Sequence, residues 1–532
     1  MNGLAGTATL FRLALRRDRV MLPAWVAFLT AAVASTAYSF HRLYPNPAAR
    51  EQLAASLVSN SSLRALYGPL NDPSTIGGIT AWRMGVFGPA LAGLMSILLV
   101  VRHTRAEEED GRLELVGAGA VGRGAALTAA LLTALGANLL LAPLVTAVLL
   151  AYGQHWAGSL AFGVAIAACG VVLAAVAAVT AQLTETGRAA TGWATTLLGL
   201  AYVLRAGGDS GPQWLSRLSP IGWSEWIAPF AADRWWVLAV PLTCAAVLTC
   251  GAYLLVAHRD LGAGLLPQRA GRAVALPALR TPLALAWRLQ RGSLYGWCVG
   301  LAVVGTVIGS TSKGVLQLIE HNPELARILS TTDGQQTIVD TYLSTAMGLI
   351  GMVCAGYAVH AVLRLRGEET GGRAEPVLAT AVSRLRWAVG HLLYPLLGSA
   401  LLLAVSGLAA GLAKGVVLRN GAGSHGSVRE VVAGALVQLP AVWLTAAAAT
   451  ALLGLLPRWS TLGWGVLAFF VLVGWLGPAL QLGQWLLDLS PFTHLPRLPG
   501  GPFKAQPLLW QSLLSALLTA AGLLGLRHRD LG

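Results

Sequence analysis

Two segments of the chain carry a dense mixture of carboxylates and arginines, and they are copies of each other. Residues 105–123 read RAEEEDGRLELVGAGAVGR and residues 366–384 read RGEETGGRAEPVLATAVSR, with 11 identities in 19 positions. Acids and arginines at this density can form ion pairs that set register and partner choice at a protein interface. A solvated loop with local ion pairs is the alternative, and the repetition favours a docking surface that is presented twice.

The candidate docking residues recur at a constant spacing of 261 positions. They are Arg105, Glu107, Glu108, Arg112 and Glu114 in the first copy, and Arg366, Glu368, Glu369, Arg373 and Glu375 in the second. The copies also differ, at Glu109 and Thr370, at Asp110 and Gly371, and at Leu115 and Pro376. These differences leave open whether the two docking sites are equivalent.

The sequence shows no motif for ATP binding, metal binding or catalysis. A Walker phosphate-binding loop ends in Gly-Lys-Ser/Thr, whereas the three lysines here precede Gly314, Gly415 and Ala505. No His-Glu-x-x-His, Asp-rich metal-diphosphate motif or nucleophile elbow is present, and the five cysteines lack metal or redox spacing. We therefore expect no catalytic residue, no metal site and no cofactor on this chain. If ATP and Mg²⁺ drive it, a partner subunit supplies their site.

The composition is that of an integral membrane protein. Hydrophobic residues make up 55% of the chain and charged residues 11%, whereas soluble domains carry about 25% charged residues. Apolar runs of about 20 residues predict membrane-spanning helices. We expect an all-α fold with twelve spans, near 21–40, 84–102, 125–152, 159–183, 190–206, 235–257, 293–312, 345–363, 387–412, 433–456, 461–482 and 507–526.

The net charge of +14 comes from 34 arginines and three lysines that are spread along the loops. This distribution indicates the positive-inside bias of membrane proteins and no nucleic-acid partner. With the N-terminus inside, 23 of the 37 basic residues fall on inner segments. The prediction is a multi-pass protein with both termini in the cytoplasm.

The repeat extends well beyond the charged segments. Residues 218–220 (LSP) match 489–491, and residues 258–262 (HRDLG) match 528–532. Each copy contains six predicted spans, so both copies have the same orientation and form a parallel repeat. We expect one unit at residues 1–262, a cytoplasmic linker at 263–280 and a second unit at 281–532.

A basic segment precedes the first predicted span of each unit and alternates with apolar residues at helical spacing, which is typical of an interfacial helix. Its arginines are Arg12, Arg16 and Arg19 in the first unit and Arg288 and Arg291 in the second. A membrane anchor and a contact with a partner subunit are both compatible with this pattern.

The outer segments 207–234 and 483–506 are rich in tryptophan and proline. An aromatic belt at the lipid–water interface explains most of this enrichment. A gate for a transported molecule is the alternative, and its candidate residues are Pro220, Trp223, Trp226, Pro491 and Phe492.

All 23 acidic residues fall in loops or near span ends in this assignment. Proton- or sodium-coupled transporters usually need carboxylates inside the membrane. The sequence therefore disfavours secondary transport. Arg205 lies at the outer end of a predicted span, where we expect its side chain to reach toward the interface.

The order of these features resembles the permease subunit of an ABC-2 type exporter. The closer resemblance is to an actinobacterial group of polyketide-antibiotic exporters that includes tetronasin-type permeases. The segments that carry it are LRRDR at 15–19, the two Arg-x-Glu-Glu segments, LSPIGW at 218–223, LSPF at 489–492, PRLPG at 496–500 and the two HRDLG motifs.

The resemblance implies a fused pseudo-dimer that pairs with two copies of a separate cytoplasmic ATPase. The charged loops 103–124 and 364–386 would each hold a coupling helix that docks one ATPase, and the cargo path would lie between spans 2 and 5 and their repeats, 8 and 11. The expected function is ATP-driven export of lipophilic small molecules from a bacterial cell. The alternatives are a proton-coupled drug transporter, an exporter of lipid or cell-envelope precursors, and a membrane-anchored assembly protein.

Overall fold

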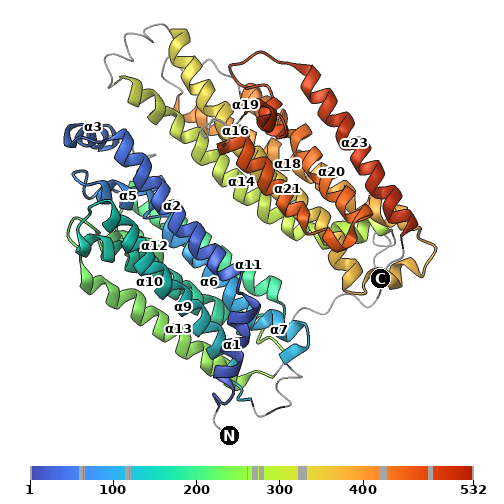
Figure 1. Ribbon diagram of the computed structural model, residues 1–532, viewed down its shortest axis with the longest axis horizontal. Helices are drawn as coiled ribbons and strands as arrows, with labels where there is room; N and C mark the ends of the chain where they lie inside the picture. Colours follow the sequence, from blue (N-terminus) through green and yellow to red (C-terminus); the bar gives the residue numbers. More distant parts are fainter. Residues whose placement is uncertain are drawn as a thin grey trace. The chain divides into compact units, whose positions relative to one another are not determined.

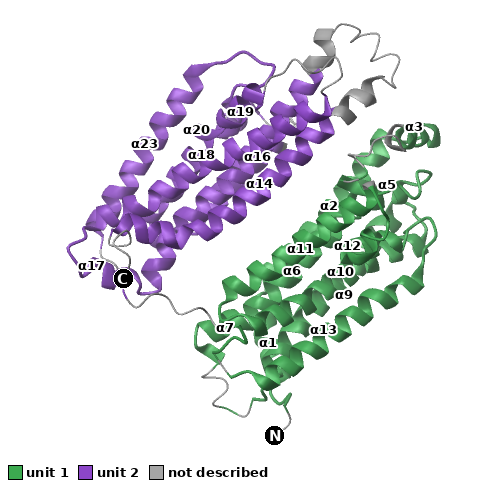
Figure 2. Ribbon diagram, turned by 180° about the vertical axis from the view of Figure 1, so that it is seen from behind, with its two compact units in different colours: residues 1–271 green, residues 272–532 purple. Residues whose placement is uncertain are grey.

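A computed structural model describes residues 3–58, 64, 66–113, 119, 121–260, 262–266, 274, 281–320, 332–418, 428–476 and 483–529. The chain forms two compact units, residues 1–271 and residues 272–532 (Figure 2). All regular structure in the described ranges is helical. The predicted all-α fold is therefore confirmed, and each unit is considered by itself below.

The first unit is a bundle built around α10, which packs against α6, α9, α11 and α13 (Figure 1). Its helices are α1 (Thr7–Arg17), α2 (Met21–Leu43), α3 (Pro47–Val58), α5 (Ile76–Met84), α6 (Phe87–His103), α7 (Arg105–Glu109), α9 (Ala125–Ala151), α10 (Trp156–Leu183), α11 (Gly187–Ser210), α12 (Pro220–Trp226) and α13 (Ala239–His258), with 3₁₀ turns η1 (Ser216–Leu218) and η2 (Trp235–Leu238).

The second unit packs α16, α18 and α20 together, with α14 against α18 and α23 against α20. Its helices are α14 (Pro282–Glu320), α16 (Thr332–Thr370), α17 (Ala374–Leu378), α18 (Arg384–Val417), α19 (Val428–Leu436), α20 (Leu439–Leu455), α21 (Leu462–Val471), α22 (Gln484–Leu487) and α23 (Ala505–His528), with short turns η4 (Pro457–Trp459), η5 (Leu472–Leu476) and η6 (Pro491–His494).

Ten helical segments in the described ranges are long and apolar enough to cross a membrane, rather than the predicted twelve. The two exceptions are the fifth span of each predicted unit. Helix α11 is long enough, but it carries Arg188, Arg205 and Asp209. The other is a shorter apolar helix, Leu462–Trp475, and the remaining predicted residues 477–482 lie outside the described ranges.

Burial separates the central helices from the peripheral ones. In the apolar stretch of α10, 78% of the residues are buried, whereas in the apolar stretches of α2 and α13 only 22% are. The uncovered positions are themselves apolar, as at Leu242, Val247 and Leu254 on α13. Outward-facing leucines on helices with satisfied backbones are what a lipid environment requires. The protein is a multi-pass membrane protein.

The predicted interfacial segments differ between the two units. In the first unit α1 is a separate amphipathic helix that packs on α9, with Arg12, Arg16 and Arg19 exposed. In the second unit α14 runs unbroken from Pro282, so Arg288 and Arg291 lie exposed on the first turns of a long helix. A separate helix before the first span is therefore present in the first unit, whereas in the second unit the basic segment is continuous with the span, and an interfacial position stays a prediction for both.

Candidate functional site

The first charged loop is held to its own unit by a buried carboxylate. Glu108 on α7 accepts hydrogen bonds from both terminal nitrogens of Arg259, at 2.8 and 2.9 Å, and from the backbone N–H of Gly262 at 2.6 Å. Arg105 forms a further ion pair with Glu108 at 2.8 Å. Both Arg259 and Gly262 belong to the HRDLG motif that ends this unit. The motif therefore binds the charged loop directly.

Arg105 extends this network to a third helix. Its side chain is 1% exposed, and it donates to the carbonyl of Thr184 at the end of α10 and to the carbonyl of Ala263. A buried charge is costly unless it is paired and hydrogen-bonded, and these carbonyl acceptors together with Glu108 meet that requirement for the Arg105 guanidinium. The charged end of α7 is thus joined to the ends of α10 and α13.

The second unit repeats the glutamate–arginine contacts at the centre of this network. Glu369 accepts hydrogen bonds from Arg529 at 2.5 and 2.6 Å, and Arg366 pairs with Glu369 at 3.1 Å. Glu369 and Arg366 correspond to Glu108 and Arg105, and Arg529 corresponds to Arg259. A sequence repeat is therefore also a repeat of one specific contact.

Two more contacts of the loops are duplicated. Arg123 donates to the carbonyl of Arg259, and its counterpart Arg384 donates to the carbonyl of Arg529 at 2.6 Å. The helical part of each loop ends at a glycine with positive φ, Gly111 at 71° and Gly372 at 67°. Glycine adopts this left-handed conformation without steric cost. Both loops therefore turn in the same way after their buried acids.

The remaining charged residues of the loops differ in exposure, because Arg112, Arg373 and Glu375 are exposed, Glu107 is partly buried and Glu368 is buried. Glu107 pairs with Arg17 of α1 and with Arg112, whose side chain is 53% exposed. In the second unit Glu368 pairs with Arg373, which is 64% exposed, and Glu375 is exposed. Glu114 lies outside the described residues. Of the predicted docking set, Arg112, Arg373 and Glu375 thus offer the most accessible charge.

One cluster beneath α1 belongs to the first unit alone. Asp18 is fully buried, and its carboxylate contacts His103 at 2.5 Å and Arg102 at 3.2 Å. The repeat places Gln290 where the first unit has Asp18. Gln290 is buried and donates to the carbonyl of His391 at 3.2 Å. The sequence comparison alone gave no sign that these positions were buried.

At the opposite end of each unit, the LSP motif fastens a short helix to the bundle. Ser219 caps α12, and its hydroxyl donates to the carbonyl of Ala201 on α11 at 2.7 Å. Ser490 makes the equivalent contact with the carbonyl of Phe470 on α21 at 2.8 Å. Serine followed by proline is a favourable start for a helix. The motif therefore has a structural reason to be repeated.

The candidate gate residues take part in this packing. Trp223 is buried, and its indole N–H donates to the carbonyl of Arg217 at 2.5 Å. Trp226 is half-buried and meets Trp236 edge to face, with ring centroids 5.0 Å apart. Pro220 is the first residue of α12. In this structure these side chains pack within the unit and do not form a simple belt of exposed rings.

In the second unit the corresponding residues are packed as well. Pro491 is buried, and its carbonyl accepts a hydrogen bond from Gln511 of α23 at 2.8 Å. Phe492 packs against the hydrophobic core of that unit. Of the five candidate gate residues, only Pro220 and Pro491 occupy matching positions of the repeat, each directly after the serine that binds the fifth predicted span of its unit.

Arg205 is fully buried, so the expectation that it reaches the interface is wrong. It pairs with Asp209 at 3.1 Å and with Glu225 at 3.4 Å, and it donates to the carbonyl of Leu66 at 3.2 Å. The two acids keep the guanidinium inside the bundle. Burial raises the pKa of Glu225 well above its usual range and also raises the pKa of Asp209, while the Arg205 charge opposes both shifts.

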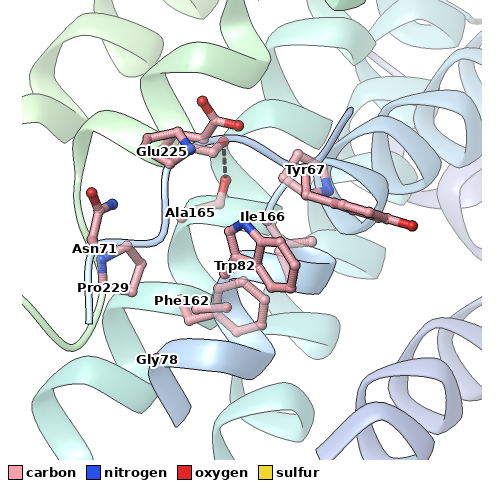
Figure 3. Close-up of a pocket in the computed structure, with 14 residues that line it drawn as sticks. Tyr67, Asn71, Gly78, Trp82, Phe162, Ala165, Ile166, Glu225 and Pro229 are labelled. Atoms are coloured by element: carbon pink, nitrogen blue, oxygen red, sulfur yellow. Dashed lines mark hydrogen bonds between the residues drawn. The ribbon is translucent and has the colours of Figure 1, made fainter. Parts of the chain in front are cut away.

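A small pocket lies next to this cluster (Figure 3). Tyr67, Trp82, Phe162 and Glu225 line it, together with Asn71. The rings of Tyr67 and Trp82 lie 5.2 Å apart, and Trp82 donates to the carbonyl of Gly68 at 3.0 Å. The pocket is therefore walled by side chains that are themselves held in place.

The second unit holds a different buried ion pair. Asp340 lies within the candidate span Ile338–Thr370 and pairs with Lys414 of α18 at 3.6 Å. Asp340 is the third residue of that 33-residue segment, so it lies near a span end, which is where the sequence allows acidic residues. Helix α16 begins at Thr332, well before the predicted span at 345–363, and this is why the sequence assigns Asp340 to a loop.

Lys414→Met is expected to lower the thermal stability of the protein, because Asp340 is then left buried without a counter-charge. Such a loss costs roughly 3–5 kcal/mol. Thermal unfolding in detergent measures it, and adding Asp340→Asn should recover most of the loss. Equal stability of the single variant and the parent protein would show that Asp340 does not need Lys414.

Comparison with known proteins identifies the family of nearly the whole chain. The family model described as "Multidrug efflux system permease Rv1217c, C-terminal domain" matches residues 8–256 and again residues 279–527. The chain belongs to this family of multidrug efflux permeases. The same model therefore covers both copies of the charged network described above.

One curated relative is similar over nearly the full length. The multidrug efflux system permease protein Rv1217c of Mycobacterium tuberculosis is 46% identical over 531 residues, which span 99% of this chain and 96% of the relative. These matches confirm the expected efflux-permease family. Neither match is to the tetronasin-type group that the sequence resembles more narrowly.

Proposed function

We propose that this chain is the membrane permease of an ATP-driven exporter of lipophilic small molecules. Two copies of a separate cytoplasmic ABC-type ATPase would supply ATP and Mg²⁺, and the chain itself would carry no catalytic site. The family match, the multi-pass helical bundle and the duplicated charged loops support this proposal. Membrane lipids surround the chain, and no nucleic acid takes part.

The observation that carries the proposal is the duplicated charged loop. In each unit a buried glutamate–arginine network fixes a loop whose neighbouring charges are exposed, at Arg112 in one unit and at Arg373 in the other. Two like surfaces on one chain suit two copies of one soluble partner, because charge complementarity sets register and partner choice. A homodimeric ATPase meets this requirement.

The proposed topology places both charged loops and both termini in the cytoplasm. The arginine-rich segments Arg12–Arg19, 103–124 and 364–386 would then face the ATPase side of a bacterial cell membrane, in agreement with the positive-inside rule. The short helices α12 and η6 would lie at the opposite surface, where Trp223 and Phe492 border the exit.

The cargo is proposed to be amphipathic and drug-like. The relative is named as a multidrug efflux permease, and large apolar side chains are exposed on many helices of this chain. Apolar sites with few polar groups accept lipophilic ligands. A polyketide antibiotic is the narrower candidate that follows from the tetronasin-type resemblance, and a lipid or envelope precursor is the competing cargo.

Reconstitution tests the proposal. The chain and its co-purifying ATPase, placed in proteoliposomes, should move a fluorescent lipophilic compound only when ATP is present, and vanadate should stop the movement. Transport driven by a proton gradient without ATP would instead establish the secondary transporter. ATP hydrolysis that no lipophilic compound alters would favour an assembly protein, and stimulation by a membrane lipid alone would favour the lipid exporter.

A further inference from the structure

Membrane orientation alone does not explain the HRDLG motif that ends each unit. The positive-inside bias needs only basic residues, in any order, yet the whole pentapeptide is repeated. In both units the arginine of the motif is the residue that caps the last helix, Arg259 after α13 and Arg529 after α23. In both it binds the same glutamate of the charged loop.

We propose that Arg259 and Arg529 are positioning residues that lock each charged loop to the last membrane helix of its unit. This inference rests on the proposed function, in which the loops receive the ATPase. It adds that the loop and the last helix move as one body, so that the HRDLG motif carries the ATPase movement to α13 and α23.

In the first unit the locked glutamate lies on a helix too short to hold its own position. Helix α7 has five residues, and isolated helices shorter than about 12 residues are marginal in water. Its placement must therefore come from contacts with other elements, whereas in the second unit Arg366 and Glu369 lie on the last turn of the long helix α16, which the lock joins to the end of α23. For α7 the charged contacts of Glu108 and Arg105 lead to Arg259, Gly262, Ala263 and Thr184.

The ion pairs of Glu108 with Arg259 and of Glu369 with Arg529 are also costly to break. The side chains of Glu108 and Glu369 are only 4% and 5% exposed, and Arg259 and Arg529 are 10% and 13% exposed. An ionised carboxylate at this depth is costly unless it is paired and hydrogen-bonded. Opening either lock would leave such a carboxylate short of its main partner, so the loop is expected to follow the helix end.

Gly262 explains why the motif ends in glycine. Its φ is +82°, a left-handed conformation that presents its backbone N–H to Glu108 at 2.6 Å. Side chains other than glycine rarely adopt this conformation. The counterpart Gly532 lies outside the described residues. In the first unit, the glycine and the arginine of the motif thus serve the same carboxylate.

Hydrogen exchange on the full-length permease tests the lock without any ATPase. In the double variant Arg259→Ala/Arg529→Ala, amides of residues 105–112 and 366–373 are expected to exchange at least about tenfold faster, because charged hydrogen bonds that restrain them are lost. Arg527→Ala is the matched control, since Arg527 is an exposed arginine two residues before Arg529. Unchanged exchange in the double variant would overturn the proposal.

The same variants in complex with the ATPase separate positioning from folding. The double variant should require at least about tenfold more ATPase for half-maximal hydrolysis and should transport less cargo per ATP, while Arg259→Lys/Arg529→Lys recovers part of both. Wild-type coupling in the double variant would contradict the lock. Failure of the unmodified permease to bind an ATPase would instead contradict the proposed function. The hydrogen-exchange experiment needs no ATPase, so it would still test the contact between each loop and the last helix.

Discussion

Reversing the charge of both exposed loop arginines, by Arg112→Glu and Arg373→Glu, is expected to weaken ATPase binding at least about a hundredfold and to abolish ATP-dependent export. The two side chains are 53% and 64% exposed at equivalent positions of the repeat. Each reversal places a negative charge where the partner is shaped for a positive one, and such a like-charge contact costs several kcal/mol. Titration of the ATPase against its hydrolysis rate measures the loss.

The matched control for this variant is Arg458→Glu. Arg458 is exposed in the turn η4 and belongs to neither charged loop. It should leave ATPase binding close to that of the parent protein, and each single reversal should fall between the control and the double variant. If the double reversal binds the ATPase as tightly as the control, the loops do not form the docking surface.

Arg205→Ala is expected to destabilise the protein by roughly 3–5 kcal/mol, because it leaves Asp209 and Glu225 buried without their shared counter-charge. For a unit of this size the melting temperature should fall by about 10 °C. Arg234→Ala removes an exposed arginine from the same end of the unit and should have little effect. Thermal unfolding in detergent compares the two variants.

The loss in Arg205→Ala should depend on pH with a definite sign. Burial raises the pKa of Glu225 above its reference value of 4.5 and raises that of Asp209, so the folded state holds these protons longer than the unfolded state. The stability that these two carboxyl groups add by holding protons in the folded state is fully present below their unfolded-state pKa values and is lost as the pH rises. Removing Arg205 raises both pKa values further, so the deficit should grow from pH 4.5 toward neutral. Adding Asp209→Asn and Glu225→Gln should remove this dependence, and a deficit that is equal at every pH would contradict the assignment.

The membrane character and the helical class follow from the sequence because apolar runs of span length have few other structures available. The number of spans follows less directly. The apolar run at 190–206 predicts a span, but helix α11 extends to Ser210 and includes Arg205 and Asp209, which pair with each other. The composition of a stretch shows that it is apolar, but it does not show that two of its charged side chains form an ion pair in the folded protein.

The charged repeat identifies the candidate docking residues, but it does not show which of them are buried and which are exposed. Glu107 and Glu108 are adjacent in sequence, yet one faces α1 and the other is enclosed by Arg105 and Arg259. The contact between Glu108 and Arg259 joins residues 151 positions apart. The two repeated motifs were both visible in the sequence, but only the fold shows that they bind each other.

The central claim is that one chain carries two docking sites for the same ATPase, and the mass of the native complex tests it most directly. Gentle extraction of the chain with its partner, followed by native mass spectrometry, should give one permease chain and two ATPase subunits. The Arg112→Glu and Arg373→Glu single variants should each retain one. A parent complex with no ATPase, or with one copy that neither variant displaces, would contradict the account.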